Sequence, residues 1–241
     1  YIVSILAVAG AAYFIYSSDW LLSEYLRIES RFLVNLNEKH MRKHRDQLCN
    51  EEGCSEIWFD EDVQLAHYKL PANCKFIGQT LLQTKFRSNY GCNILQITTP
   101  QAVIDMPGAD YILEAASTLL IIGTREQFKM FNAAVASKQI DLEPLAEPIS
   151  LRQFMLQSHE EKPELQFLSL AITVDEHSKL LGKSIKDANI RENWSALVLG
   201  LERGAYTITN PNISLTFEKG DLLWVLGKQK MLNALIREEV L

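Results

Sequence analysis

The sequence predicts an α+β protein in which an N-terminal, partly transmembrane helix precedes two tandem modules, each a small, mostly antiparallel sheet with helices. Three observations support this prediction. The chain repeats itself at a constant offset of 104 residues, and it opens with an uncharged, mostly apolar stretch. Each copy of the repeat also contains short apolar strand patterns next to helix patterns. A repeat of about 80 to 90 residues is long enough to bury a small core of its own.

The repeat aligns without a gap. The identical anchor pairs are Gly78 and Gly182, Arg87 and Arg191, Asn89 and Asn193, Leu95 and Leu199, Pro107 and Pro211, Glu114 and Glu218, Leu119 and Leu223, and Gly123 and Gly227. Apolar character is retained between these anchors. Because an internal repeat reflects a repeated structural unit, we expect two copies of one domain rather than a single enzyme barrel.

Residues 1–18 carry no charge, and Asp19 is the first charged residue. A helix of about 20 apolar residues spans a bilayer, and about 18 is already a candidate. No Met and no basic segment precede this stretch, so we interpret it as the end of the last transmembrane helix rather than a signal peptide. Tyr13, Tyr16 and Trp20 would then lie in the interfacial aromatic belt. The alternative is a buried N-terminal helix of a soluble domain.

Residues 19–48 are predicted to continue as an amphipathic juxtamembrane helix. Apolar residues from Leu21 to Leu36 recur mostly every three or four positions, which places them on one helix face. A basic run at 39–45 follows, and basic residues near a membrane end favour the cytoplasmic side. We therefore expect the cell inner membrane as the location, with residues from about 20 onward in the cytoplasm.

The composition argues against several partners and cofactors. The formal net charge is −6, so the chain lacks the basic surface that nucleic acid binding needs. Four cysteines do not make a disulfide framework; they are Cys49, Cys54, Cys74 and Cys92. Cys49 and Cys54 could form a zinc site with His40 and His44, but the C-x4-C spacing is loose, and we expect no metal.

Catalysis is not expected. His67, His159 and His177 lie in different sequence environments, and neither a G-x-S-x-G nor an H-E-x-x-H motif occurs. The eleven glycines also lack the G-x-G-x-x-G spacing of a dinucleotide-binding Rossmann domain. We therefore assign no catalytic residue and no resident cofactor.

Both copies have the same predicted order of elements. In the first copy, strands are expected at 65–70, 93–98, 103–106 and 118–122, with a short helix over 76–84 and a closing helix over 125–136. In the second copy, strands are expected at 167–174, 196–201, 205–209 and 222–226, with helices over 180–188 and 228–239. Gly78 and Gly182 fall inside the short helices, where glycine costs about 1 kcal/mol relative to alanine, so they predict close backbone packing. A linker at 138–164 carries three prolines and a predicted helix at 151–157.

The second copy resembles the RCK-C (TrkA-C) module, the C-terminal subdomain of proteins that regulate potassium conductance. The residues that carry this resemblance are Leu-Gly-Lys-Ser at 181–184, Arg191, Asn210-Pro211 and Glu-Lys-Gly-Asp-Leu-Leu-Trp-Val-Leu-Gly at 218–227. The first copy is more divergent, since Ala116-Ser117 replaces the Gly-Asp of the last turn and Gln79 replaces the lysine. The expected domain ranges are 57–137 for module 1 and 165–241 for module 2.

Residues 27–38 are similar to the segment that follows the last membrane helix in Kef-like bacterial cation:proton antiporters. This resemblance implies the regulatory or dimerisation tail of a monovalent cation (K⁺ or Na⁺)/proton antiporter. The transmembrane domain would belong to the same polypeptide, with homodimerisation through the modules. Three alternatives remain: a ligand-free dimerisation clamp, the tail of a potassium channel or uptake system, and modules placed between two membrane halves of another carrier.

In modules that resemble cyclic di-AMP receptors, an arginine and an asparagine six residues later contact the ligand. The resemblance therefore implies these ligand-binding residues: Leu81, Arg87, Cys92, Asn93, Ile94 and Arg191. A guanidinium binds phosphate and an amide reads a base edge, so these residue types suit a regulatory nucleotide such as cyclic di-AMP. The second copy has Leu197 in place of the asparagine. Alternatively, Arg87 and Arg191 cap helix ends or pair with Glu114 and Glu218.

Overall fold

The structure is a computed structural model that describes residues 62–157, 167–204, 206–209 and 211–240. The predicted helices at 1–18 and 19–48 lie outside these residues, as does the group of His40, His44, Cys49 and Cys54. Within the described residues, no helix is long and apolar enough to cross a bilayer. In the same part of the chain, no cluster of His, Cys, Asp and Glu side chains could hold a metal ion.

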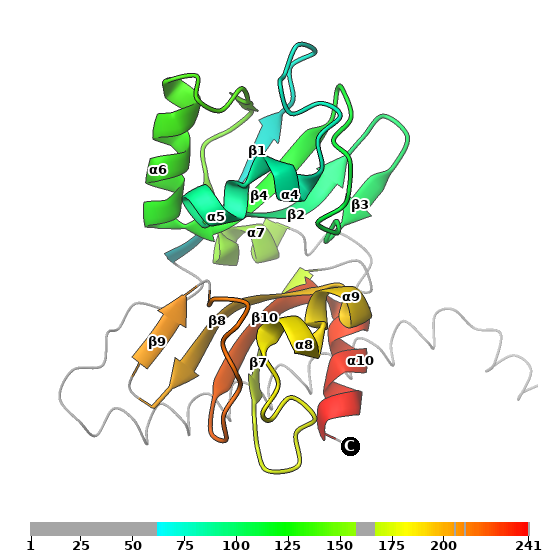
Figure 1. The fold of residues 1–241 in the computed structure, drawn as a ribbon, viewed down its shortest axis with the longest axis vertical. Helices are drawn as coiled ribbons and strands as arrows, with labels where there is room; N and C mark the ends of the chain where they lie inside the picture. Colours follow the sequence, from blue (N-terminus) through cyan, green and yellow to red (C-terminus); the bar gives the residue numbers. More distant parts are fainter. Residues whose placement is uncertain (1–61, 158–166, 205, 210, 241) are drawn as a thin grey trace, which may run out of the picture.

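The first module is an antiparallel sheet in the order β3-β2-β4-β1, with helices beside it (Figure 1). Its strands are β1 (Val63–Lys69), β2 (Asn93–Thr98), β3 (Val103–Asp105) and β4 (Thr118–Thr124). Two short helices, α4 (Leu81–Thr84) and α5 (Phe86–Tyr90), connect β1 to β2, and α6 (Arg125–Ala136) follows β4. Strand β1 pairs with β4 along its whole length.

The second module repeats this arrangement in the order β7-β10-β8-β9. Its elements are β7 (Phe167–Thr173), α8 (Ile185–Ala188), α9 (Ile190–Trp194), β8 (Ala196–Arg203), β9 (Tyr206–Thr209), β10 (Leu222–Lys228) and α10 (Gln229–Val240). Each element lies one repeat offset after its counterpart, and β7 pairs with β10 in the register of β1 with β4. The predicted fold class, two small antiparallel α+β modules, is confirmed.

The prediction of close backbone packing at Gly78 and Gly182 is wrong. The short helices begin only at Leu81 and Ile185, after the capping residues Thr80 and Ser184. Both glycines lie in the preceding turns with φ of +80° and +76°, and a Cβ added at either would meet nothing within 4 Å. Glycine stands there because it adopts a left-handed backbone without steric cost.

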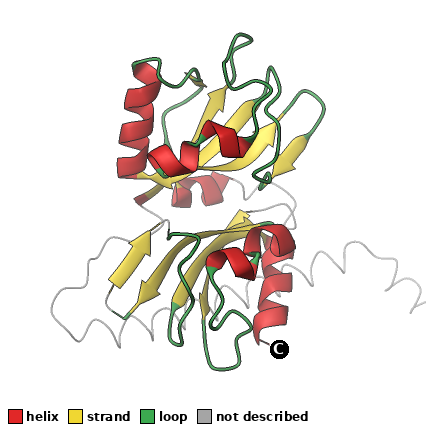
Figure 2. Cartoon of the chain, viewed as in Figure 1, coloured by secondary structure: helices red, strands yellow, loops and turns green. Residues whose placement is uncertain are grey.

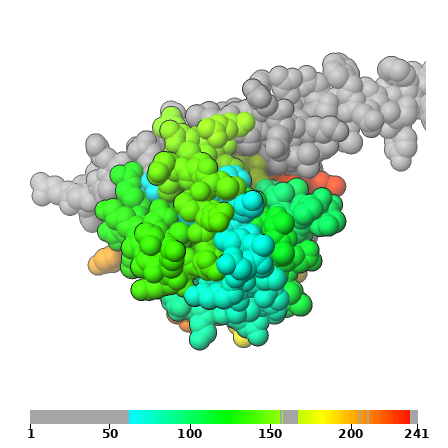
Figure 3. Space-filling view, turned by 90° about the horizontal axis from the view of Figure 1, so that it is seen from above, coloured from blue at the N-terminus to red at the C-terminus, as the bar shows by residue number. Residues whose placement is uncertain are grey.

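The segment after α6 does more than link the modules. Residues 143–144 form β5 (Glu143–Pro144) and residues 149–150 form β6 (Ile149–Ser150), and both pair with β1. Seen from above, this segment lies beside β1 on the surface (Figure 3). Pro144 is tolerated because β5 is an edge strand, where proline removes no ladder hydrogen bond. The linker prediction missed these strands, since two-residue strands leave no periodic pattern.

The two sheets pack against each other, so the modules pair within the chain. One face of each sheet packs against its own helices, as Leu119 and Ile121 of β4 do. The opposite face contributes to a shared cluster of buried residues: Val63, Leu65, Leu95, Met106, Leu120, Ile122, Leu151, Phe167, Leu197, Leu199 and Leu226. Because neighbouring strand residues point to opposite faces, both faces of each sheet are apolar. Helix α7 (Leu151–Gln157) lies between the modules (Figure 2).

A β-bulge shapes this shared cluster in the same way in both modules. The pairing of β2 with β4 shifts register between Ile94 and Gln96, and the pairing of β8 with β10 shifts at the repeat-related place. The extra residues are Leu95 and Leu199, and both are buried in the shared cluster. A bulge lets a strand turn one additional side chain toward a chosen face. The duplicated unit therefore retained the feature that it uses for pairing.

Candidate functional site

The two repeat-related arginines make reciprocal contacts across the modules. Arg87 of α5 donates from Nη2 to the carbonyl of Pro211 at 3.3 Å. Arg191 of α9 donates from Nη2 to the carbonyl of Pro107 at 2.6 Å. Since Pro107 and Pro211 are themselves repeat-related, each module's arginine binds the other module's proline turn. The two modules therefore form a pseudo-twofold pair.

The interpretation of these arginines as helix caps or as partners of Glu114 and Glu218 is wrong. In the described part of the chain, neither guanidinium forms an ion pair, and the hydrogen bonds of both cross the interface. Glu218 instead pairs with Arg203 at 2.5 Å. Helices α5 and α9 thus direct their arginines toward the other module, and the cation that pairs with Glu218 comes from its own module.

Two partly buried positive charges lie at the interface, and the hydrogen bonds of both guanidinium groups go to neutral carbonyls. Burial lowers the pKa of Arg87. Burial also lowers the pKa of Arg191, followed by the positive charge of Arg87, while Glu192 acts in the opposite direction. Arg191 Nε is buried and has no hydrogen-bond partner within the described residues. A buried donor left unmatched beside a second cation favours binding of an anion.

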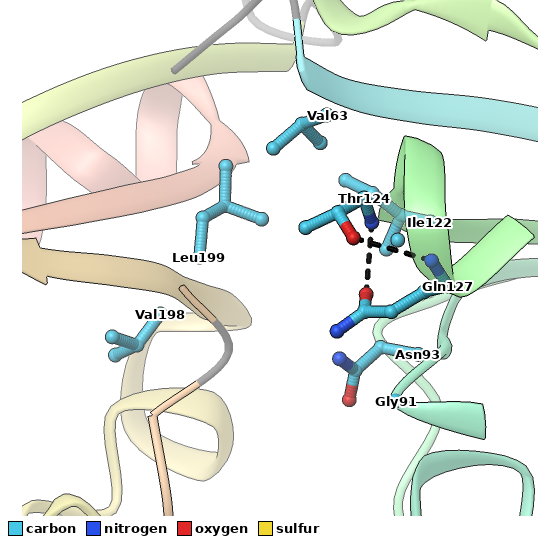
Figure 4. A pocket seen from close by; sticks show the side chains of 9 residues that line it. Val63, Gly91, Asn93, Ile122, Thr124, Gln127, Val198 and Leu199 are labelled. Carbon is cyan, nitrogen blue, oxygen red and sulfur yellow. Dashed lines mark hydrogen bonds between the residues drawn. The ribbon is translucent and has the colours of Figure 1, made fainter. Parts of the chain in front are cut away.

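A small cavity lies beside Asn93 at the same interface (Figure 4). Its volume is ≈ 20 Å³, and Asn93, Thr124 and Gln127 of module 1 face Val198 and Leu199 of module 2 across it. Such a volume holds about one water molecule. The cavity is therefore far smaller than a nucleotide in this arrangement of the modules.

The walls of this cavity are held by a capping box. Thr124 Oγ1 accepts the backbone N–H of Gln127 at 3.3 Å, and Gln127 Oε1 accepts the backbone N–H of Thr124 at 2.8 Å. This exchange starts helix α6 and satisfies two otherwise unpaired donors. Thr124 and Gln127 were not among the predicted site residues. The signal available in the sequence was the Thr-x-x-Gln spacing before a helix pattern.

The predicted ligand-binding residues separate into two groups. Arg191 donates to the carbonyl of Ile94 at 3.2 Å, which brings it next to Asn93 from the opposite module. Leu81, Cys92 and the Ile94 side chain instead pack in the core of module 1. Burial raises the pKa of Cys92 to about 12, as suits a thiol in an apolar core. Of the predicted residues, Arg87, Asn93 and Arg191 thus lie at the interface between the modules.

The comparisons with known proteins identify the modules. The TrkA-C domain model matches residues 65–136 and 170–239, which lie within the ranges predicted for the two modules. An uncharacterized transporter of Synechocystis sp. is 25% identical over 162 residues, covering 67% of this chain and 25% of that protein. The uncharacterized transporter YfbS of Escherichia coli (strain K12) is 25% identical over 166 residues, again 67% of this chain and 25% of that protein.

The chain thus spans about 25% of the length of these curated relatives. Among solved structures, the RCK-C domain dimer of S. agalactiae BusR, in complex with c-di-AMP, is 26% identical with a TM-score of 0.28. That similarity covers 29% of this chain and 92% of the solved one.

Proposed function

This chain belongs to the TrkA-C domain family, and on that premise we propose that it is the regulatory region of a membrane ion transporter. Its two modules form one pair within the chain, and the pair responds to a small phosphate-bearing ligand at the module interface. The similarity to two transporters, each about four times as long as the matched segment, supports a membrane domain elsewhere in the same polypeptide. A regulatory tail of this kind could also pair with a second copy.

One observation carries the ligand proposal: Arg87 and Arg191 meet at the interface with carbonyl oxygens as their hydrogen-bond acceptors. Carbonyls are neutral, so these acceptors do not compensate the two partly buried positive charges, and Glu192 has a smaller effect on the pKa of Arg191 than burial and Arg87 have. A phosphate placed between them would remove their mutual repulsion and supply an acceptor for Arg191 Nε. Arginine favours phosphate because its planar donors match two phosphate oxygens.

Regulation follows from the size of the interface cavity. A cavity of ≈ 20 Å³ admits no nucleotide, so a bound ligand requires a second arrangement of the two modules. A ligand that binds one arrangement better shifts the population toward it. Any membrane segment attached to the modules would then be biased, which is the coupling that allostery requires.

The second candidate function is a ligand-free clamp that holds transporter segments together. It is favoured by the same arginines, because each already has acceptors in the partner module. The shared cluster of buried residues also stabilises the pair without any ligand. The two candidates differ in whether an added nucleotide binds.

Calorimetric titration of the 241-residue chain distinguishes sensor from clamp. The ligands are cyclic di-AMP, AMP and ATP, chosen because each carries phosphate and a base. We expect micromolar binding that Arg87→Ala and Arg191→Ala each weaken about tenfold or more, since each removes a charge-assisted hydrogen bond. The matched control is Lys129→Ala, which removes one exposed positive charge from α6 and leaves binding unchanged. Absence of heat with all three ligands would establish the clamp instead.

For the transported ion, we propose a monovalent cation exchanged for protons. The support is the similarity of residues 27–38 to the segment after the last membrane helix of Kef-like antiporters. The test is proton efflux from proteoliposomes that contain the full-length transporter, measured after addition of K⁺ or Na⁺. A cation-dependent change in internal pH is expected. Transport of another solute without proton exchange would point to a carrier of a different class.

A further inference from the structure

A hollow of ≈ 510 Å³ lies in module 2 beside helices α8 and α9, which Figure 1 labels. Leu180, Ala188 and Trp194 give it apolar surface, and Lys179 and Lys183 give it two positive charges. Every residue that lines it belongs to module 2, so the hollow is separate from the interface between the modules. Its volume lies in the range of sites that bind small molecules or short segments of chain.

The charge of the hollow is positive on balance. Its acidic residue, Asp187, is engaged at the start of α8: Oδ2 accepts the hydroxyl of Ser184 at 2.6 Å, and the backbone N–H donates to the same hydroxyl oxygen at 3.1 Å. Lys179 and Lys183 are exposed, and within the described residues neither forms an ion pair. The hollow therefore presents two ammonium groups to an occupant.

Module 1 uses its own chain to cover the corresponding residues. Lys75, which is repeat-related to Lys179, donates from Nζ to the carbonyl of Gln139 at 2.5 Å. The neighbouring Cys74 donates from Sγ to the carbonyl of Asp141 at 3.0 Å. The extended segment that follows α6 thus lies against the place that corresponds to one wall of the hollow.

The same segment supplies a buried apolar side chain to module 1. Ile140 is 2% exposed and belongs to the core cluster that contains Phe76 and packs against Tyr90. Phe76 and Tyr90 are repeat-related to Leu180 and Trp194, which line the hollow. In the described part of module 2, no residue corresponds to Ile140. Module 1 therefore shows which chemistry covers this surface: extended chain with an apolar side chain.

We infer that the hollow is a docking site for an extended segment of a partner protein, in which an apolar side chain lies between acidic residues. The apolar side chain packs toward Trp194, and the carboxylates face Lys179 and Lys183. Opposite charges favour this partner over a neutral or basic segment. Module 1 does not supply the occupant, because its segment is already held by Lys75 and Cys74. The site lies apart from the sensor function and does not depend on it.

The test uses a fluorescein-labelled peptide with the sequence of residues 138–146, Lys-Gln-Ile-Asp-Leu-Glu-Pro-Leu-Ala, added to the 241-residue chain. Fluorescence anisotropy should show saturable binding of one peptide per chain that weakens as salt is added. Lys179→Glu and Lys183→Glu should each weaken binding about fivefold, because each replaces an attraction by a repulsion. The matched control is Lys186→Glu, which reverses an exposed charge on α8 outside the hollow and leaves binding unchanged.

A second control changes the peptide. The Ile140→Asp peptide should not bind, since it places a charge where module 1 buries an apolar side chain. All three lysines are exposed, so their variants should retain the thermal unfolding midpoint of the unaltered chain.

Three results would overturn the docking site. One is the absence of peptide binding, and another is binding that neither Lys179→Glu nor Lys183→Glu weakens. The third is a concentration-dependent dimer in sedimentation that both variants abolish, because a second copy would then occupy the hollow. None of these results bears on the sensor function, whose test measures nucleotide binding and the arginines of the interface.

Discussion

Arg203 and Asp221 show how one pair of side chains supports the turn before β10. Arg203 binds both oxygens of the buried Asp221 carboxylate at 2.8 Å, and that carboxylate also accepts the backbone N–H of Glu218 at 2.7 Å. The hydrogen bond to Asp221 raises the pKa of Arg203. At the repeat-related positions, module 1 has Thr99 and Ser117. Module 1 therefore lacks both members of the pair, and the buried Asp221 carboxylate would be unpaired without Arg203.

In module 1, which lacks this ion pair, the corresponding turn has two unfavourable features. Ala116 stands where module 2 has Gly220, and it adopts a left-handed backbone with φ of +60°. The Ser117 hydroxyl is buried without a hydrogen-bond partner among the described residues. Both features are unfavourable, since alanine resists positive φ and buried polar groups need partners. The replacement of Gly-Asp by Ala116-Ser117 in module 1 therefore changes the structure of the turn before β4.

Tyr68 provides a residue-scale prediction with a defined pH dependence. Its hydroxyl donates to Asn132 Oδ1 at 2.5 Å and fixes α6 on the sheet. Tyr68→Phe should lower the free energy of unfolding by about 1 to 2 kcal/mol at neutral pH, because one partly buried acceptor loses its donor. Burial raises the pKa of Tyr68 above its ordinary value of 10.0, so the folded chain holds this proton more tightly than the unfolded chain.

The sign of the pH effect follows from this difference. Above the ordinary pKa, the unfolded chain loses the proton first, and the stability of the unaltered chain falls with pH. The Tyr68→Phe variant has no phenol at this position, so its stability does not fall for this reason. The difference in the free energy of unfolding between the unaltered chain and Tyr68→Phe therefore narrows above pH 10.0. Urea unfolding of both proteins at neutral and alkaline pH measures this difference in the free energy of unfolding. A difference that widens with pH would contradict this account, and the exposed Tyr206→Phe serves as control.

At the scale of elements, local sequence patterns predicted a helix or strand correctly where its buried side chains recur at a regular spacing. Helix α6 spans Arg125–Ala136 as predicted, because Thr124 and Gln127 form a capping box and Phe128 and Phe131 follow at helical spacing. The region before α4 was misjudged. Apolar residues such as Phe76 and Ile77 mimic a helix pattern, although they lie in successive turns that a glycine with positive φ connects.

The edge strands β5 and β6 also could not be predicted from the local sequence pattern. Strands β5 and β6 exist because β1 offers its free edge to the segment after α6. Their residues carry no strand pattern of their own, and Pro144 argues against a strand in isolation. Such a strand is determined by its partner, and the partner lies more than seventy residues earlier in the chain.

For the whole molecule, the shared apolar cluster predicts that the two modules unfold together. Leu95→Asp or Leu199→Asp places a charge among buried apolar residues from both modules, and burying an unpaired charge is strongly unfavourable. The modules should separate in either variant, and the single calorimetric transition of the unaltered chain should become two. Scanning calorimetry provides the measurement.

The control for this prediction is Val103→Asp, which adds the same charge to the exposed edge strand β3 and preserves one transition. Because Leu95 and Leu199 belong to different modules, agreement between the two variants excludes simple unfolding of one module. If both variants retained a single transition at an unchanged temperature, the shared cluster would not couple the modules.

The sequence by itself determined the duplication, the order of strands and helices within each copy, and the absence of a G-x-G-x-x-G motif. These are local or periodic properties, which neighbouring residues encode. Only the tertiary structure decided that the modules pair face to face, that Arg87 and Arg191 each bind the proline turn of the other module, and that Lys228 of module 2 pairs with Asp105 of module 1. Each of these features depends on contacts between residues about a hundred positions apart, whose spatial approach no local pattern records.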